Sequence, residues 1–200
     1  MKHLMILAVF LATVFIAAPV SKADTLVFLA NLGDFESPPT GSPGTGFARV
    51  TLDTVANTMR VEVTFSGLTS NNTAAHIHAS TPAPFTGNAG VATTTPTFTG
   101  FPGGVTAGTY DHTFDMTLAT SYNPAFVTAN GGTAASAEAA LFAGIIAGRS
   151  YLNIHTSNFG GGEIRGFLVA QTPEPATMLL FGSGVAGLAL KLRRRRKAQQ

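Results

Sequence analysis

The sequence predicts an all-β fold, an antiparallel β-sandwich with one short helix, between residues 24 and 170. Apolar and polar residues alternate with a period of two in several short segments of this region, as they do in strands with one buried face. The composition has 22 glycines and 15 phenylalanines with only 11% charged residues. It favours strands and turns, because long amphipathic helices need more Leu, Glu and Lys. Close spacing of the segments is typical of a sandwich.

Seven segments are expected to be strands. They are residues 25–32, 47–53, 59–65, 73–79, 110–118, 151–156 and 163–170. The second and third are predicted to form a hairpin that returns near Asn57. The last two are expected to pair around residues 157–162, which contain three consecutive glycines. In the fifth segment the alternation places Phe114, Met116 and Leu118 on one face.

Two segments depart from this pattern. Residues 133–147 are rich in alanine, have no glycine before Gly144, and are followed by Gly148. We expect a short helix that begins at Thr133 or Ser136. Residues 81–108 are rich in Thr, Pro and Gly, which indicates a long loop with one or two strand fragments.

The N-terminal residues 1–23 are typical of a secretory signal peptide. Lys2 precedes an apolar stretch, and Ser21 and Ala23 are small residues that favour cleavage before Asp24. The alternative is an uncleaved anchor helix.

The C-terminal residues divide into three parts. Residues 171–175 are a linker with Pro173, Glu174 and Pro175, residues 176–192 are predicted to be a transmembrane sorting helix, and residues 193–200 are a basic cytoplasmic tail. Basic residues stay on the cytoplasmic side, so the domain is expected outside the inner membrane.

This tail resembles the PEP-CTERM sorting signal of Gram-negative bacteria. The resemblance implies an exosortase-type enzyme as partner, a transient stay in the inner membrane, and delivery to the cell surface or extracellular matrix. The alternative is a plain single-span anchor. Gly182, Gly184 and Gly187 also match a dinucleotide-binding pattern, but they follow no predicted strand, so we expect no such site.

Charge and cysteine content exclude several classes of function. Residues 24–170 contain four arginines and nine acidic residues, a formal charge of about −5, which excludes a nucleic-acid interface. The absence of cysteine excludes disulfides, thiolate catalysis and Cys-based zinc sites.

Two segments of the domain carry distinctive motifs. They are Phe65-Ser66-Gly67-Leu68 with Ala75-His76-Ile77-His78, and residues 141–148 followed by Tyr151-Leu152-Asn153-Ile154-His155-Thr156 and Gly162-Glu163-Ile164-Arg165-Gly166. Together they resemble the CHRD (chordin-type) domain family. The similarity covers about residues 25–170. It implies an immunoglobulin-like sandwich and no settled enzymatic activity.

Three histidines are candidate metal ligands. On a strand His76 and His78 point to one face, about 7 Å apart. If the strand of His155 lies beside them, three imidazoles could hold zinc or copper with a water. Ring nitrogens within about 5 Å of one another would support this site, and a separation above about 8 Å would exclude it.

The pattern is also similar to that of Cu/Zn superoxide dismutase, which has an early H-x-H strand and a later histidine ligand. Residues 81–108 contain no His or Asp for its bridging and zinc ligands, and the chain lacks its disulfide. We therefore expect no dismutase activity.

A purely structural role is the alternative for these polar residues. Asn153, Glu163 and Arg165 are expected to form a polar cluster with His155, in which Glu163 could pair with Arg165 or with His155.

The function expected from these features is that of an exported, non-enzymatic surface or matrix protein. Its domain would serve adhesion, scaffolding or contact with an extracellular polysaccharide or surface protein. The competing hypothesis is a metal-binding or redox domain that uses His76, His78 and His155. A periplasmic hydrolase would need a nucleophile and base that the sequence does not display.

Overall fold

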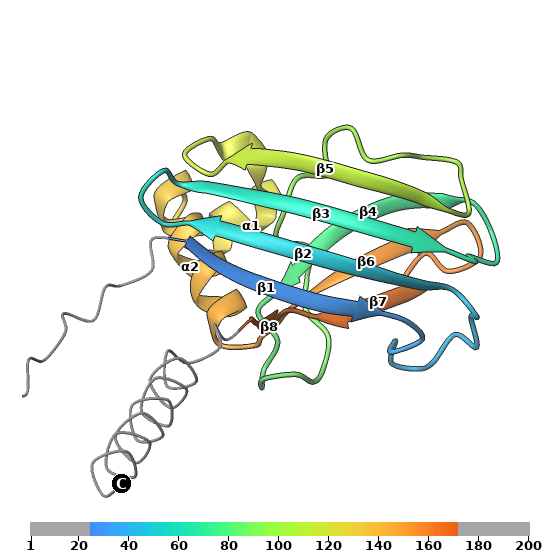
Figure 1. Ribbon diagram of the computed structural model, residues 1–200. Helices are drawn as coiled ribbons and strands as arrows, with labels where there is room; N and C mark the ends of the chain where they lie inside the picture. Colours follow the sequence, from blue (N-terminus) through green and yellow to red (C-terminus); the bar gives the residue numbers. More distant parts are fainter. Residues whose placement is uncertain (1–24, 172–200) are drawn as a thin grey trace, which may run out of the picture.

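The computed structural model describes residues 25–171, which fold into two antiparallel sheets facing each other (Figure 1). The larger sheet has the order β5-β3-β2-β1-β8, with β1 Thr25–Leu32, β2 Thr45–Asp53, β3 Thr58–Ser66, β5 Gly108–Asp115 and β8 Val169–Ala170. The smaller sheet has the order β4-β6-β7, with β4 Asn72–Ala79, β6 Ser150–Thr156 and β7 Ile164–Phe167. This architecture confirms the predicted all-β sandwich. The finer immunoglobulin-like assignment stays a prediction.

The predicted signal peptide, sorting motif, membrane helix and basic tail lie outside the described residues. Between residues 25 and 171 no helix is both long and apolar enough to cross a membrane.

The hairpin of β2 and β3 forms as predicted. Arg49 pairs with Glu62 and Asp53 with Thr58 across the two strands. The Asp53 carboxylate accepts hydrogen bonds from the N–H groups of Val55 and Ala56, and Asn57 has a φ of 52°. Asn tolerates this left-handed conformation well, which explains why the chain reverses here.

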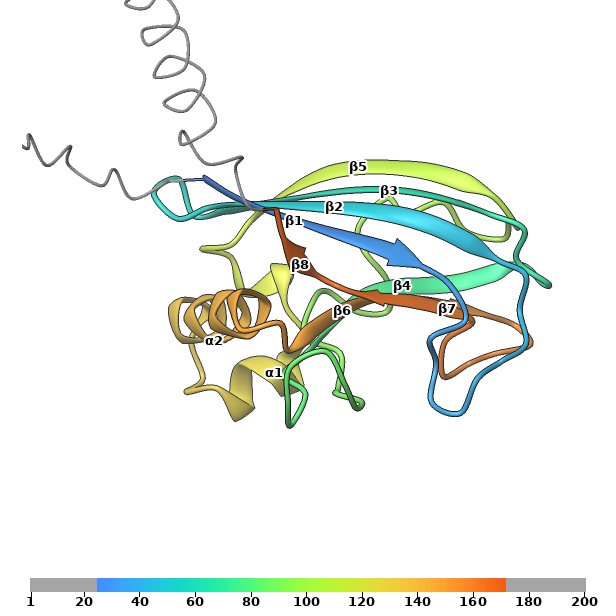
Figure 2. The same cartoon turned by 60° about the horizontal axis from the view of Figure 1, so that its bottom comes forward.

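Strand alternation divides the smaller sheet into an apolar and a polar face. Ala75 and Ile77 of β4, and Leu152 and Ile154 of β6, are completely buried against the larger sheet. Their neighbours in sequence, including His76, His78 and Asn153, project to the opposite face. Figure 2 shows the two sheets as layers, with β4, β6 and β7 on the side of the long loops. Those loops cover the polar face, so its side chains are buried as well.

The described residues contain more helices than the sequence predicted. Helix α2, Ala134–Ile146, confirms the predicted helix, and Thr133 and Ser136 form a capping box at its start. A second helix, α1 Pro124–Ala129, and a 3₁₀ turn, η1 Ala119–Ser121, were not predicted, so the expectation of one short helix is wrong. The signal for α1 was the pair Asn123-Pro124, a capping residue followed by proline at the first helical position.

Two strand predictions need correction. The segment predicted as one strand over residues 163–170 is two strands: β7 pairs with β6, and β8 pairs with β1 in the other sheet. Between them Leu168 is completely buried. The segment predicted over residues 110–118 ends at Asp115, and Leu118 is 51% exposed instead of sharing the buried face of Phe114 and Met116. The long loop predicted after β4 is present and contributes only isolated bridges.

Candidate metal centre

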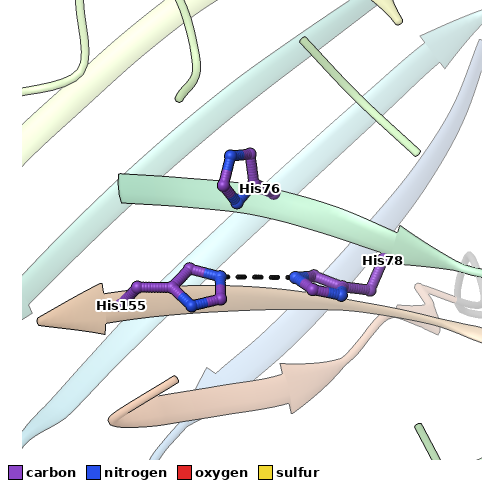
Figure 3. A group of neighbouring side chains, drawn as sticks. All are labelled: His76, His78 and His155. Atoms are coloured by element: carbon purple, nitrogen blue, oxygen red, sulfur yellow. Dashed lines mark hydrogen bonds between the residues drawn. The ribbon is translucent and has the colours of Figure 1, made fainter. Parts of the chain in front are cut away.

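The three candidate histidines meet on the polar face of the smaller sheet. One ring nitrogen from each of His76, His78 and His155 lies within 4.8 Å of the other two. The Nε2 atoms of His78 and His155 are 3.4 Å apart, and His76 lies above them in Figure 3. This separation is within the limit of about 5 Å that we set in the sequence analysis for a shared metal ion. His112, the remaining histidine of the domain, is on β5 of the other sheet and outside this group.

The strand register explains the meeting point. His76 pairs with Asn153, His78 with Tyr151, and His155 with Ala74. His78 and His155 therefore lie on opposite sides of the His76–Asn153 pair along the sheet. Since their Nε2 atoms approach within 3.4 Å, both rings lean toward that central pair.

A backbone carbonyl orients each imidazole. The oxygen of Pro96 lies 2.7 Å from His76 Nε2, that of Ala89 lies 2.9 Å from His78 Nδ1, and that of Gly160 lies 2.9 Å from His155 Nδ1. A ring nitrogen that faces a carbonyl oxygen carries the hydrogen and donates it. The other nitrogen of each neutral ring then has a free lone pair: Nδ1 of His76, and Nε2 of His78 and His155. Metal-ligating histidines are held in the same way, with the second nitrogen bonded to a carbonyl or carboxylate.

Burial keeps the three rings neutral. His76, His78 and His155 are 5%, 7% and 8% exposed. Desolvation, together with the nearby His155 and His78, lowers the pKa of His76 to about 4. Desolvation likewise lowers the pKa of His78 to about 4 and also lowers the pKa of His155. Neutral imidazole is the form that binds metal.

The spacing of the free nitrogens fits a metal ion better than a hydrogen bond. With both Nδ1 atoms donating to carbonyls, neither Nε2 of His78 nor Nε2 of His155 has a hydrogen to share. Two lone pairs would face each other at 3.4 Å. Two nitrogens bound to one tetrahedral zinc at the usual bond length lie about 3.3 Å apart. The Nδ1 atom of His76 is buried without any partner, as a third ligand atom would be before metal enters.

Asn153, Glu163 and Arg165, the residues of the predicted polar cluster, are all buried, but each bonds to partners outside that cluster. Glu163 is completely buried and accepts hydrogen bonds from Ser42 Oγ, Thr69 N–H and Thr156 Oγ1 at 2.6–2.7 Å. It bonds to neither Arg165 nor His155, so the predicted pair is wrong. Because three neutral donors satisfy this carboxylate, they outweigh desolvation and lower its pKa. Glu163 thus ties two loops to the smaller sheet.

Arg165 has partners that sequence reasoning missed. Its Nε donates to the oxygen of Phe35, and its Nη1 donates to Asn88 Oδ1 at 2.6 Å and lies 3.7 Å from Glu36 Oε2. Its guanidinium carbon is 4.7 Å from the centre of the Tyr151 ring, which stacks on His78. Glu36, Asn88 and the three carbonyls lie in loops, where no periodic pattern could have identified them.

Beside the histidines there is a surface pocket of about 430 Å³. Its lining includes Glu36, His78, Asn88, Tyr151 and Gly162. Of the three histidines of the cluster, His78 lines this pocket.

The comparisons with known proteins agree with both resemblances seen in the sequence. The sequence model of the CHRD domain matches residues 28–168, and that of the PEP-CTERM protein-sorting motif matches residues 171–196. No curated protein and no solved structure gives a match. The two matches indicate an exported protein that an exosortase recognises at its sorting motif. The CHRD match covers nearly all the described residues, and this chain belongs to the CHRD domain family.

Proposed function

We propose that this exported CHRD protein binds one zinc or copper ion through His76, His78 and His155. The observation that supports this most strongly is the 3.4 Å approach of two Nε2 atoms whose rings both donate their hydrogen elsewhere. A buried contact between two lone pairs is unfavourable, and a metal ion makes it favourable. Nitrogen ligands suit zinc and copper better than magnesium or calcium, which prefer oxygen.

The test is metal analysis and calorimetric titration of the purified exported protein after treatment with a chelator. We expect one zinc or copper ion per chain, and no binding at this site in the double variant His76→Ala/His78→Ala. The control variant His112→Ala changes a histidine outside the cluster and should bind as the wild type does. Absence of binding in the wild-type protein, or equal binding by the double variant, would exclude the site.

We also propose the steps by which the protein reaches the cell surface. Residues 1–23 would be removed as a signal peptide, the apolar residues 176–192 would hold the domain outside the inner membrane, and exosortase would act near Pro173–Pro175. The match of the sorting motif supports this order. Fractionation of cells tests it, because abundant mature protein in the cytosol would contradict it.

An adhesive or scaffolding role without catalysis is the second candidate. The sorting motif favours it, since it directs proteins to the surface and its matrix. A polysaccharide or a surface protein would be the partner. Retention of the purified protein on matrix polysaccharide from the producing cells would support this role, and passage without retention on matrix and cell envelopes alike would oppose it.

A further inference from the structure

Two acceptor oxygens beside the histidine cluster have no donor. Glu36 Oε1 and Asn153 Oδ1 are buried and make no hydrogen bond. The Asn153 amide nitrogen donates to the oxygen of Gly161, while the amide oxygen accepts no hydrogen bond. Both oxygens border the position that a Cβ atom on Gly162 would occupy, so they lie next to each other. Since an unsatisfied buried acceptor costs about 1–3 kcal/mol, a missing donor belongs here.

One of these two residues adjoins the histidines, and the other lines the pocket. Asn153 is the cross-strand partner of His76, over which the rings of His78 and His155 converge. Glu36 lines the pocket together with His78 and Gly162. A molecule that enters the pocket therefore meets a histidine of the cluster and the Glu36 carboxylate together.

The histidine cluster leaves one coordination position for such a molecule. Within residues 25–171 the group that can share a metal ion contains three histidines and no Asp, Glu or Cys. Zinc and copper sites with three nitrogen ligands take a fourth ligand, commonly water. No further His, Asp, Glu or Cys side chain of residues 25–171 belongs to this group. We therefore expect the fourth ligand to be a molecule from solution.

We propose that this fourth position opens toward the pocket and takes a protic oxygen ligand, whose hydrogen is donated to Glu36 or Asn153. This inference rests on the proposed metal site. A water or the hydroxyl group of a small molecule has the required chemistry, because its oxygen binds the metal while its hydrogen satisfies an acceptor. An anion without hydrogen would be repelled by the Glu36 carboxylate and by the Asn153 amide oxygen. An ammonium group has no lone pair with which to bind the metal.

The first experiment uses the wild-type exported protein loaded with one equivalent of Cu(II). Electron–nuclear double resonance should detect a strongly coupled proton that disappears in D₂O, as expected for a metal-bound O–H group. Azide, a small anionic ligand for copper, should produce a saturable charge-transfer band at high concentration, because it can occupy the same position although the Glu36 carboxylate weakens its binding. If one copper is bound but both signals are absent, the fourth position is closed and the inference is wrong. If copper itself does not bind, the proposed function fails instead.

A matched pair of variants tests the role of Glu36. Glu36→Gln removes the negative charge that faces the position, so azide should bind roughly tenfold more tightly, the order expected for a unit charge acting across several ångströms of protein. Glu62→Gln is the control, because Glu62 lies on strand β3 of the larger sheet, and it should leave azide affinity unchanged. Equal azide affinity in the two variants, with both melting like the wild type, would overturn the assignment of Glu36. If Glu36→Gln does not fold, the exchangeable proton signal of the wild-type protein still decides whether the fourth position holds a protic oxygen ligand.

Glycerol distinguishes the two sources of the ligand. A change of the Cu(II) spectrum at millimolar glycerol would identify the hydroxyl group of a small molecule as the ligand. An unchanged spectrum, with the exchangeable proton still present, would identify water.

Discussion

Acidification should destabilise the metal-free domain well before its carboxylates are protonated. Burial lowers the pKa of His76 and of His78 from 6.5 to about 4. Between these values the unfolded chain binds more protons than the folded chain, so the free energy of unfolding falls as the pH falls. The stabilisation is complete above about pH 6.5 and is lost progressively toward pH 4.

The magnitude follows from the two pKa values of each group. Between pH 7.5 and pH 5, a histidine with a pKa of 6.5 unfolded and about 4 folded loses about 2 kcal/mol of stabilisation. His76 and His78 together should lose about 4 kcal/mol, a large part of the stability of an ordinary domain.

Urea unfolding of the chelator-treated protein at pH 7.5 and pH 5 measures this loss. In His78→Gln the loss should fall to about 2 kcal/mol, whereas the control His112→Gln should keep the full value. Carboxylates contribute equally to all three proteins and cancel in the comparison. A loss at pH 5 that is the same in His78→Gln as in the wild type would refute the reasoning.

Three further changes should have defined outcomes. Glu163→Gln replaces a buried carboxylate that three donors satisfy, so it should lower the free energy of unfolding by about 2–3 kcal/mol at pH 7, measured by urea unfolding, with Glu138→Gln, a partly buried glutamate of helix α2, as the control. Gly162→Ala should lower it by at least about 2 kcal/mol, because φ is 129° and the new Cβ would collide with Asn153 and Glu36; an unchanged melting curve would contradict this. Replacement of Pro173 and Pro175 by alanine should stop processing of the tail, seen as a larger chain on a gel of membrane fractions; normal processing would show that these prolines are not required.

The local part of the candidate site could be predicted from the sequence. His76 and His78 share a face because side chains alternate along a strand, whatever the rest of the fold does. The proximity of His155 depended on the pairing of β4 with β6, which are more than 70 residues apart in the chain. Alternation alone could not determine that pairing, although it placed His155 and Asn153 on the same face of their strand.

The loop contacts could not be predicted in the same way. The carbonyls that orient the three rings belong to Ala89, Pro96 and Gly160, and any residue type supplies a carbonyl. The predicted charge pair of Glu163 and Arg165 failed for a related reason. A loop brings Glu36 near Arg165, while other loops bring neutral donors to Glu163, and the sequence does not show how loops fold back on a sheet.

The most direct test of the metal site is the thermal unfolding of the exported protein with and without metal at pH 7.5. A ligand that binds only the folded state, present at a thousand times its Kd, stabilises by about 4 kcal/mol. The wild-type protein with zinc or copper should melt several degrees higher, chelator should reverse the shift, and His76→Ala/His78→Ala should show none. A melting temperature that neither metal changes, in a protein with all three histidines intact, would contradict the account.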